Sequence, residues 1–145
     1  MEAMKFRCPT ARPISSFMLR DWQLDFYSHA TVERKNGASC PGVLWDLTPE
    51  DELALDMFEG FPYYYTKTQL VQDGHTFFLY EMSENKMGLP SPGYIDGIKQ
   101  GYHEWGLPAQ ALKEALTNAN NRTIQSQRKA KFQPRKRNRQ ALWTD

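Results

Sequence analysis

The sequence predicts a single α+β domain built on a small, mixed but mainly antiparallel β-barrel with flanking helices. Apolar and polar residues alternate over several short stretches, which is typical of strands with one buried face. Turn residues separate these stretches, and helical spacing follows them in two places. The chain has 145 residues, of which 40% are hydrophobic and 24% are charged. It is therefore long enough to bury one core.

Five strand segments are expected in hairpin succession, over residues 17–26, 31–33, 42–47, 63–72 and 75–82. Asn36-Gly37 and Asp73-Gly74 stand between such segments, and both dipeptides are strong hairpin-turn signals. The hairpins predict antiparallel pairing of sequential strands.

A helix is expected after the third segment. Thr48 can cap it, Pro49 suits its first position, and the acids that follow favour the positive end of the helix dipole. Leu53, Met57 and Phe58 would form its buried face. Gly60 is expected to end it, which places Glu59 in the last turn.

The rest of the chain predicts further short helices. Residues 94–104 would direct Ile95, Ile98 and Tyr102 inward, and residues 109–116 would form a second short amphipathic helix. The opening residues 1–14 contain two prolines and no apolar face, so we expect a short helical or irregular piece there.

Glu59 is the candidate catalytic residue. It lies between Phe58 and a Gly-Phe-Pro turn, so inward-packed phenylalanines would partly desolvate it and raise its pKa. The negative end of the helix dipole would raise the pKa in the same direction. A carboxyl group of this kind suits general acid–base chemistry. The alternative is an ordinary surface acid at a helix end.

Charge divides the chain after residue 118. Residues 1–118 contain 10 Lys/Arg and 16 Asp/Glu, whereas residues 119–145 contain 8 Lys/Arg and 1 Asp/Glu. We therefore expect a domain over 1–118 and a mobile or weakly helical basic C-terminal tail over 119–145. The tail could bind nucleic acid, but it has few aromatics for stacking. A solvated tail that rests on the acidic domain is the favoured interpretation.

Several classes of protein are disfavoured. No apolar run approaches the roughly 20 residues of a membrane span or forms a signal peptide, so we expect no membrane association and a cytoplasmic location. Cys8 and Cys40 would stay reduced there. Two thiols without a histidine pattern predict no metal site, and no motif indicates a cofactor.

Several motifs together resemble one family over roughly residues 4–107, in its order and with its spacing. They are Arg7-Cys8-Pro9 with Ala11, Leu24-Asp25-Phe26, Gly42-Val43-Leu44-Trp45, Leu55-Asp56 with Glu59-Gly60 and Tyr65, Pro90-Ser91-Pro92 with Tyr94 and Ile98, Gly101, and Gly106-Leu107. On these residues the chain resembles the gamma-glutamylcyclotransferase-like (AIG2-like) proteins.

The resemblance implies a small mixed barrel with a pocket at one end and a cofactor-independent transferase reaction. The residue that matches Glu59 would be the acid–base group that releases 5-oxoproline and a free amine from a gamma-glutamyl compound. Tyr65 and Tyr94 match tyrosines expected near the pocket, although both could equally be core aromatics. Arg7 could hold the substrate's carboxylate, against the commoner case of a surface arginine.

One departure from the family's pattern keeps a second function open. The family's N-terminal strand and its Tyr-Gly-Ser-Asn loop, which would bind the substrate's carboxylate, have no match in this sequence. Either this segment lies upstream of this sequence, or the alternative to an enzyme applies, a catalytically silent protein that binds a small ligand or a partner. An unpaired sheet edge would also favour a homodimer.

Overall fold

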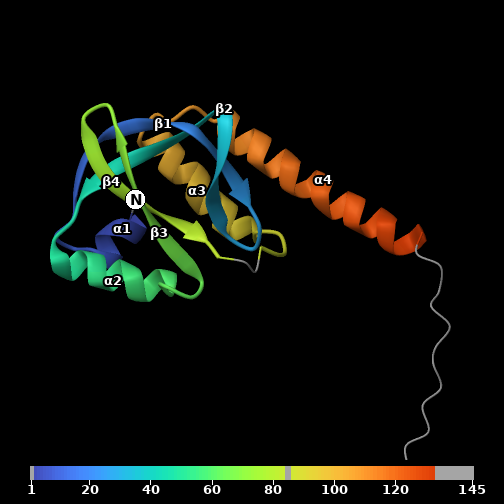
Figure 1. Ribbon diagram of the computed structural model, residues 1–145, viewed down its shortest axis with the longest axis horizontal. Coiled ribbons are helices and arrows are strands. Elements are labelled where there is room, and N and C mark those ends of the chain that lie inside the picture. The colour runs from blue at the N-terminus through green and yellow to red at the C-terminus, as the bar shows by residue number, and fades with distance from the viewer. Residues whose placement is uncertain (1, 84–85, 133–145) are drawn as a thin grey trace, which may run out of the picture.

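The computed structural model describes residues 2–83 and 86–132, which form four strands and four helices (Figure 1). They are α1 (Glu2–Arg7), β1 (Arg12–Phe26), β2 (Ala30–Asp46), α2 (Pro49–Glu59), β3 (Tyr65–Gln72), β4 (His75–Met82), α3 (Pro92–Glu104) and α4 (Gln110–Phe132). The predicted α+β class is confirmed.

β1 and β2 form one long antiparallel hairpin, with Phe26 opposite Ala30 at the turn and Arg12 opposite Asp46 at the far end. The hairpin turn predicted at Asn36-Gly37 was wrong. This dipeptide lies inside β2, where the register shifts opposite Asp21 and the Gly37 N–H donates to Asp21 Oδ1 at 3.0 Å. Gly37, at φ 81°, is accommodated as a bulge. The segments 31–33 and 42–47 are therefore parts of one strand.

β3 and β4 form the second antiparallel hairpin, with its turn at Asp73-Gly74 as predicted. The described strands thus make two two-stranded sheets, which contact each other without closing into one hydrogen-bonded ring. At one end the Met82 N–H donates to Thr31 Oγ1 at 2.9 Å. At the other end Arg20 pairs with Asp73 at 2.9 Å. These contacts join the two antiparallel hairpins in the mainly antiparallel arrangement predicted for the barrel, although the described strands leave it open.

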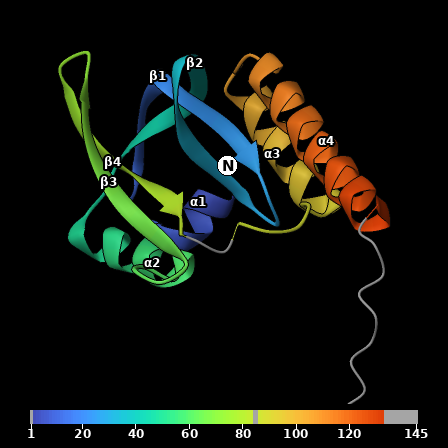
Figure 2. The ribbon, with the colours of Figure 1, turned by 45° about the vertical axis from the view of Figure 1, so that its right-hand side comes forward.

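The core lies between the β1–β2 hairpin and the helices α3 and α4, which run side by side (Figure 2). Phe26 is fully buried and Leu24 is 8% exposed, as their alternation predicts. The other buried members of this cluster are Cys40, Leu112, Ala115 and Ala119. Ile98 and Tyr102 pack against it, as predicted.

α4 is longer than the helix predicted over 109–116, and it crosses the expected boundary after residue 118. Ala119 is only 2% exposed, and the Arg122 Nη1 lies 2.8 Å from Asp25 Oδ2. The residues that begin the expected tail therefore pack on the domain. Its densest basic cluster, residues 135–139, lies outside the described residues. No helix within residues 2–83 and 86–132 is long and apolar enough to cross a membrane.

α2 begins and ends as predicted, but a different face is buried. Thr48 caps it, and Gly60 ends it in the left-handed conformation at φ 64°. Leu53, Met57 and Phe58, expected to be buried, are 65%, 85% and 56% exposed. Leu55 is buried instead, because polar contacts rather than an apolar stripe fix how α2 sits on the sheet.

Candidate active site

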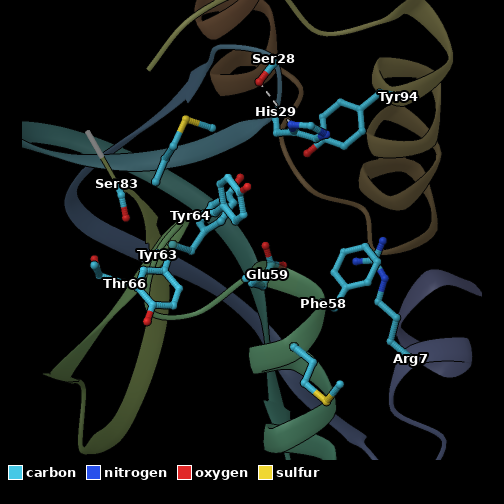
Figure 3. A pocket seen from close by; sticks show the side chains of 14 residues that line it. Arg7, Ser28, His29, Phe58, Glu59, Tyr63, Tyr64, Thr66, Ser83 and Tyr94 are labelled. Carbon is cyan, nitrogen blue, oxygen red and sulfur yellow. Dashed lines mark hydrogen bonds between the residues drawn. The ribbon is translucent and has the colours of Figure 1, made fainter. Parts of the chain in front are cut away.

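A cavity of about 930 Å³ opens at the end of α2, between the β1–β2 turn, the start of β3, α1 and α3 (Figure 3). All four candidate site residues line it: Arg7, Glu59, Tyr65 and Tyr94. The fold thus brings together residues that lie up to 87 positions apart in the sequence.

Glu59 is the last residue of α2 and lies in the middle of this group in Figure 3. Burial raises its pKa, while the positive charges of Arg7 and of a protonated His29 act in the opposite direction. The raised pKa agrees with the sequence-based prediction, but its cause differs in part. Phe58 lines the cavity but is more than half exposed, so it does not pack inward as expected.

Arg7 reaches the cavity because α1 is fixed to the start of α2. The Thr10 hydroxyl donates to Asp51 Oδ2 at 2.7 Å, and the Cys8 thiol donates to the Asp51 carbonyl at 3.6 Å. The Arg7 guanidinium carbon lies 3.4 Å from the centroid of the Phe58 ring, a cation–π contact. Within the described chain no carboxylate lies within 4.0 Å of it as an ion-pair partner. Its charge is therefore available to an anionic ligand.

Tyr65 and Tyr94 both bind the backbone of Ala30, at the start of β2. The Tyr65 hydroxyl donates to the Ala30 carbonyl at 3.0 Å, whereas the Tyr94 hydroxyl accepts from the Ala30 N–H at 3.0 Å. Burial raises the pKa of Tyr65 to about 12 and also raises that of Tyr94. The Tyr94 hydroxyl therefore keeps a proton that it can donate to a ligand in the cavity. The Tyr65 hydroxyl already donates its proton to the Ala30 carbonyl.

His29 was missed by the sequence analysis, which placed the hairpin turn elsewhere. It lies in the turn between β1 and β2 and lines the cavity. Its ring packs edge-on against Tyr94, with centroids 5.3 Å apart, and its Nδ1 lies 3.3 Å from Ser28 Oγ. The signal that could have found it is the Tyr-Ser-His triplet, which separates two apolar strands.

α2 is held over β3 and β4 by a cluster of charged and aromatic side chains that lies behind Glu59. Lys67 Nζ lies 2.7 Å from both Glu52 Oε1 and Asp56 Oδ1. The Tyr80 hydroxyl donates to Asp56 Oδ1 at 2.6 Å. Burial acts to raise the pKa of Asp56, but Lys67 and Tyr80 together hold it below its ordinary range. Asp56 therefore serves as an anchor of the helix rather than as a second acid.

The cavity also holds a hydroxyl group without a partner. Ser83 Oγ is buried and has no hydrogen-bond partner among the described residues. Ser91, by contrast, caps α3 by accepting from the Tyr94 N–H at 3.2 Å. Over residues 2–83 and 86–132, no group of three or more His, Cys, Asp or Glu side chains is placed to hold a metal ion.

Solved structures with the same arrangement exist. A structure described as a gamma-glutamyl cyclotransferase matches with a TM-score of 0.64 and 23% identity, over 97% of this chain and 86% of that one. An uncharacterized human protein matches equally well, with a TM-score of 0.64 and 23% identity over 98% of this chain and 86% of that one. An uncharacterized protein from Pyrococcus horikoshii matches with a TM-score of 0.51 and 14% identity, over 72% of this chain and 85% of that one.

These matches define the class of fold. The chain has the gamma-glutamylcyclotransferase-like fold, which confirms the fold that its motifs predicted. No model of a protein family and no curated protein sequence matches it.

Proposed function

We propose that the protein is a cyclotransferase that releases 5-oxoproline and a free amine from a gamma-glutamyl compound, with Glu59 as the acid–base group. The observation that carries this proposal is the half-buried Glu59 carboxyl, whose pKa is raised by burial, in one cavity with a free cation and a phenol that can donate. The shared fold with a gamma-glutamyl cyclotransferase supports it.

The first chemical step is an attack within the substrate. Ionised Glu59 takes a proton from the substrate's α-amine, and the nitrogen then attacks the γ-carbonyl carbon to close a five-membered ring. Because nucleophile and electrophile belong to one molecule, the cavity has only to hold the folded conformer. Arg7 is placed to bind the α-carboxylate.

The second step expels the amine. The ring closure puts negative charge on the former carbonyl oxygen, and the Tyr94 hydroxyl can donate a hydrogen bond to it. Protonated Glu59 then gives its proton to the departing nitrogen as the C–N bond breaks. The proton that Glu59 took is thereby returned, so the enzyme ends in its starting state and no water is consumed.

The experiment that tests the proposal is release of 5-oxoproline and free amine from gamma-glutamyl peptides, compared between the native chain and Glu59→Gln. We expect the substitution to lower kcat by about 10²–10⁴-fold, the usual contribution of a general acid–base. Glu50→Gln is the matched control, because Glu50 lies in the first turn of the same helix, away from the cavity. Unchanged release by Glu59→Gln would refute the assigned role.

The second candidate is a silent binding protein, because among the described residues no Tyr-Gly-Ser-Asn segment lines the cavity to hold the substrate's carboxylate. The same assay separates the two functions. A silent protein would bind gamma-glutamyl peptides or a partner but release no 5-oxoproline.

Two expectations about macromolecular partners stay predictions. A homodimer would be seen by light scattering at high protein concentration. Binding of nucleic acid through the basic tail would fall steeply as salt rises, and it would disappear when the basic residues within 135–139 are replaced by glutamine, a change that leaves Ala119 and Arg122 in place on the domain.

A further inference from the structure

Two exposed tyrosines form part of the wall of the cavity. Tyr63 and Tyr64 follow Gly60 in the turn after α2 and are 84% and 74% exposed, although both line the cavity. Aromatic rings left exposed at the wall of a cavity present apolar surface that a ligand can cover. Neither ring has a role in the two chemical steps proposed above.

The turn holds both tyrosines close to Glu59. The N–H groups of Tyr63 and Tyr64 each donate to the Gly60 carbonyl at 2.9 Å. The Tyr64 ring lies against Gly60, since a Cβ at Gly60 would come within 2.5 Å of Tyr64 Cδ2. The glycine thus permits both the left-handed turn that ends α2 and the close approach of this ring. The turn therefore fixes the backbone of both tyrosines, and the contact with Gly60 places the Tyr64 ring.

The cavity has two different sides. Figure 3 shows Arg7 and Phe58 on one side of Glu59, and Tyr63 and Tyr64 on the other. A gamma-glutamyl compound also has two different ends, because the α-carboxylate and the leaving amine lie on either side of the γ-carbonyl. If the carboxylate binds Arg7, the leaving amine extends toward the two tyrosines.

We infer that the leaving amine carries an aromatic, apolar group, as in a gamma-glutamyl aromatic amino acid, and that Tyr63 and Tyr64 select it. The inference rests on the proposed function, which supplies the orientation. Stacking of a substrate ring on these two rings buries apolar surface on both partners. A small or polar leaving amine would leave the tyrosines exposed.

The test compares kcat/KM for gamma-glutamylphenylalanine, gamma-glutamylglutamine and gamma-glutamylglycine, measured as 5-oxoproline release. Gamma-glutamylglutamine controls for size without an aromatic ring. We expect the phenylalanine compound to exceed both others by at least about tenfold, in the range that apolar pocket contacts give. Equal values, or a preference for the polar compounds, would overturn the inference and leave the proposed function standing.

Variants assign the preference to the rings. The double substitution Tyr63→Ser/Tyr64→Ser should reduce the ratio for phenylalanine over glutamine to within about twofold, because the apolar surface is lost. Tyr63→Phe/Tyr64→Phe should keep the ratio, since the rings remain. Phe6→Ser is the matched control: Phe6 is 89% exposed and lies outside the cavity. An unchanged ratio in the double serine variant would overturn the assignment.

A binding measurement tests the aromatic site separately from the proposed cyclotransferase activity. Titration of the Glu59→Gln protein with the same three compounds reports preference without turnover. If the native chain releases no 5-oxoproline from any of them, the proposed function fails. Tighter binding of the phenylalanine compound to Glu59→Gln would then still support the aromatic site, whereas equal binding of all three would overturn it.

Discussion

The core between the β1–β2 hairpin and α4 buries Leu24, Phe26 and Leu112, whereas the part around α2 leaves many of its large apolar residues exposed. Phe26 in the first part has no exposed surface, while Met57 in the second is 85% exposed. The first part supplies the core on which the hairpins rest. In the second part, apolar and aromatic side chains surround the carboxyl group of Glu59. Exposed apolar surface of this kind is common where a protein contacts a ligand or a partner, which agrees with the site proposed above.

From this contrast we expect the largest loss of stability from a substitution at Phe26. Phe26→Ala should lower the free energy of unfolding by about 3–5 kcal/mol, because it leaves a cavity in a fully buried site. Urea denaturation followed by circular dichroism measures this change. A loss below about 1 kcal/mol would show that the core is placed elsewhere.

The ion pair that joins α4 to the hairpin should contribute less. Arg122→Ala leaves Asp25, which is 4% exposed, without its guanidinium partner, and should cost about 2 kcal/mol in the free energy of unfolding. Arg128→Ala is the control, because Arg128 is exposed on the same helix. Equal effects of the two substitutions would contradict the view that α4 is anchored at Arg122.

The pH dependence of activity tests the α2 region. As a base Glu59 must be ionised, so kcat/KM should rise with pH through a pKa above the ordinary value of glutamate, as its burial indicates. The charge of Arg7 lowers this pKa, so Arg7→Gln should move the rise to higher pH. Lys5→Gln, on the same helix, is the control. A rise at the same pH in Arg7→Gln would show that Arg7 does not act on Glu59.

The smallest effect is expected at Met57. Met57→Ala should change the free energy of unfolding by less than about 0.5 kcal/mol, since the side chain is already in water in the folded protein. Leu55→Ala, two residues away and 7% exposed, should cost at least about 2 kcal/mol. Similar losses at the two positions would mean that the exposed face of α2 is covered by another part of the chain or by a partner.

Local signals in the sequence predicted the local features correctly. Thr48 and Gly60 mark the two ends of α2, so the position of Glu59 at its last residue could be predicted from neighbours alone. The alternation of Leu24 and Phe26 predicted which face of the strand is buried, although the core residues that cover this face are distant in the sequence. The ends of α2 depend on contacts within a few residues, which the sequence displays directly.

Features that depend on distant partners were predicted less well. Asn36-Gly37 has the residues of a hairpin turn, yet pairing of β1 with both halves of β2 made it a bulge. The apolar face of Leu53 and Met57 predicted the wrong side of α2, because Asp51 and Asp56 make the contacts that orient the helix. The length of α4 followed from Ala119 and Arg122, whose partners lie far away in the sequence.

The carboxyl group at the end of α2, its glycine cap and the hairpin turn at Asp73-Gly74 were determined by the sequence itself, because each follows from short-range backbone and side-chain chemistry. Only the tertiary structure decided what surrounds that carboxyl group. It brings Arg7 from α1, His29 from the β1–β2 turn and Tyr94 from α3 to one cavity. Burial in that cavity raises the pKa of Glu59, and this burial depends on the packing of segments that are distant in the chain.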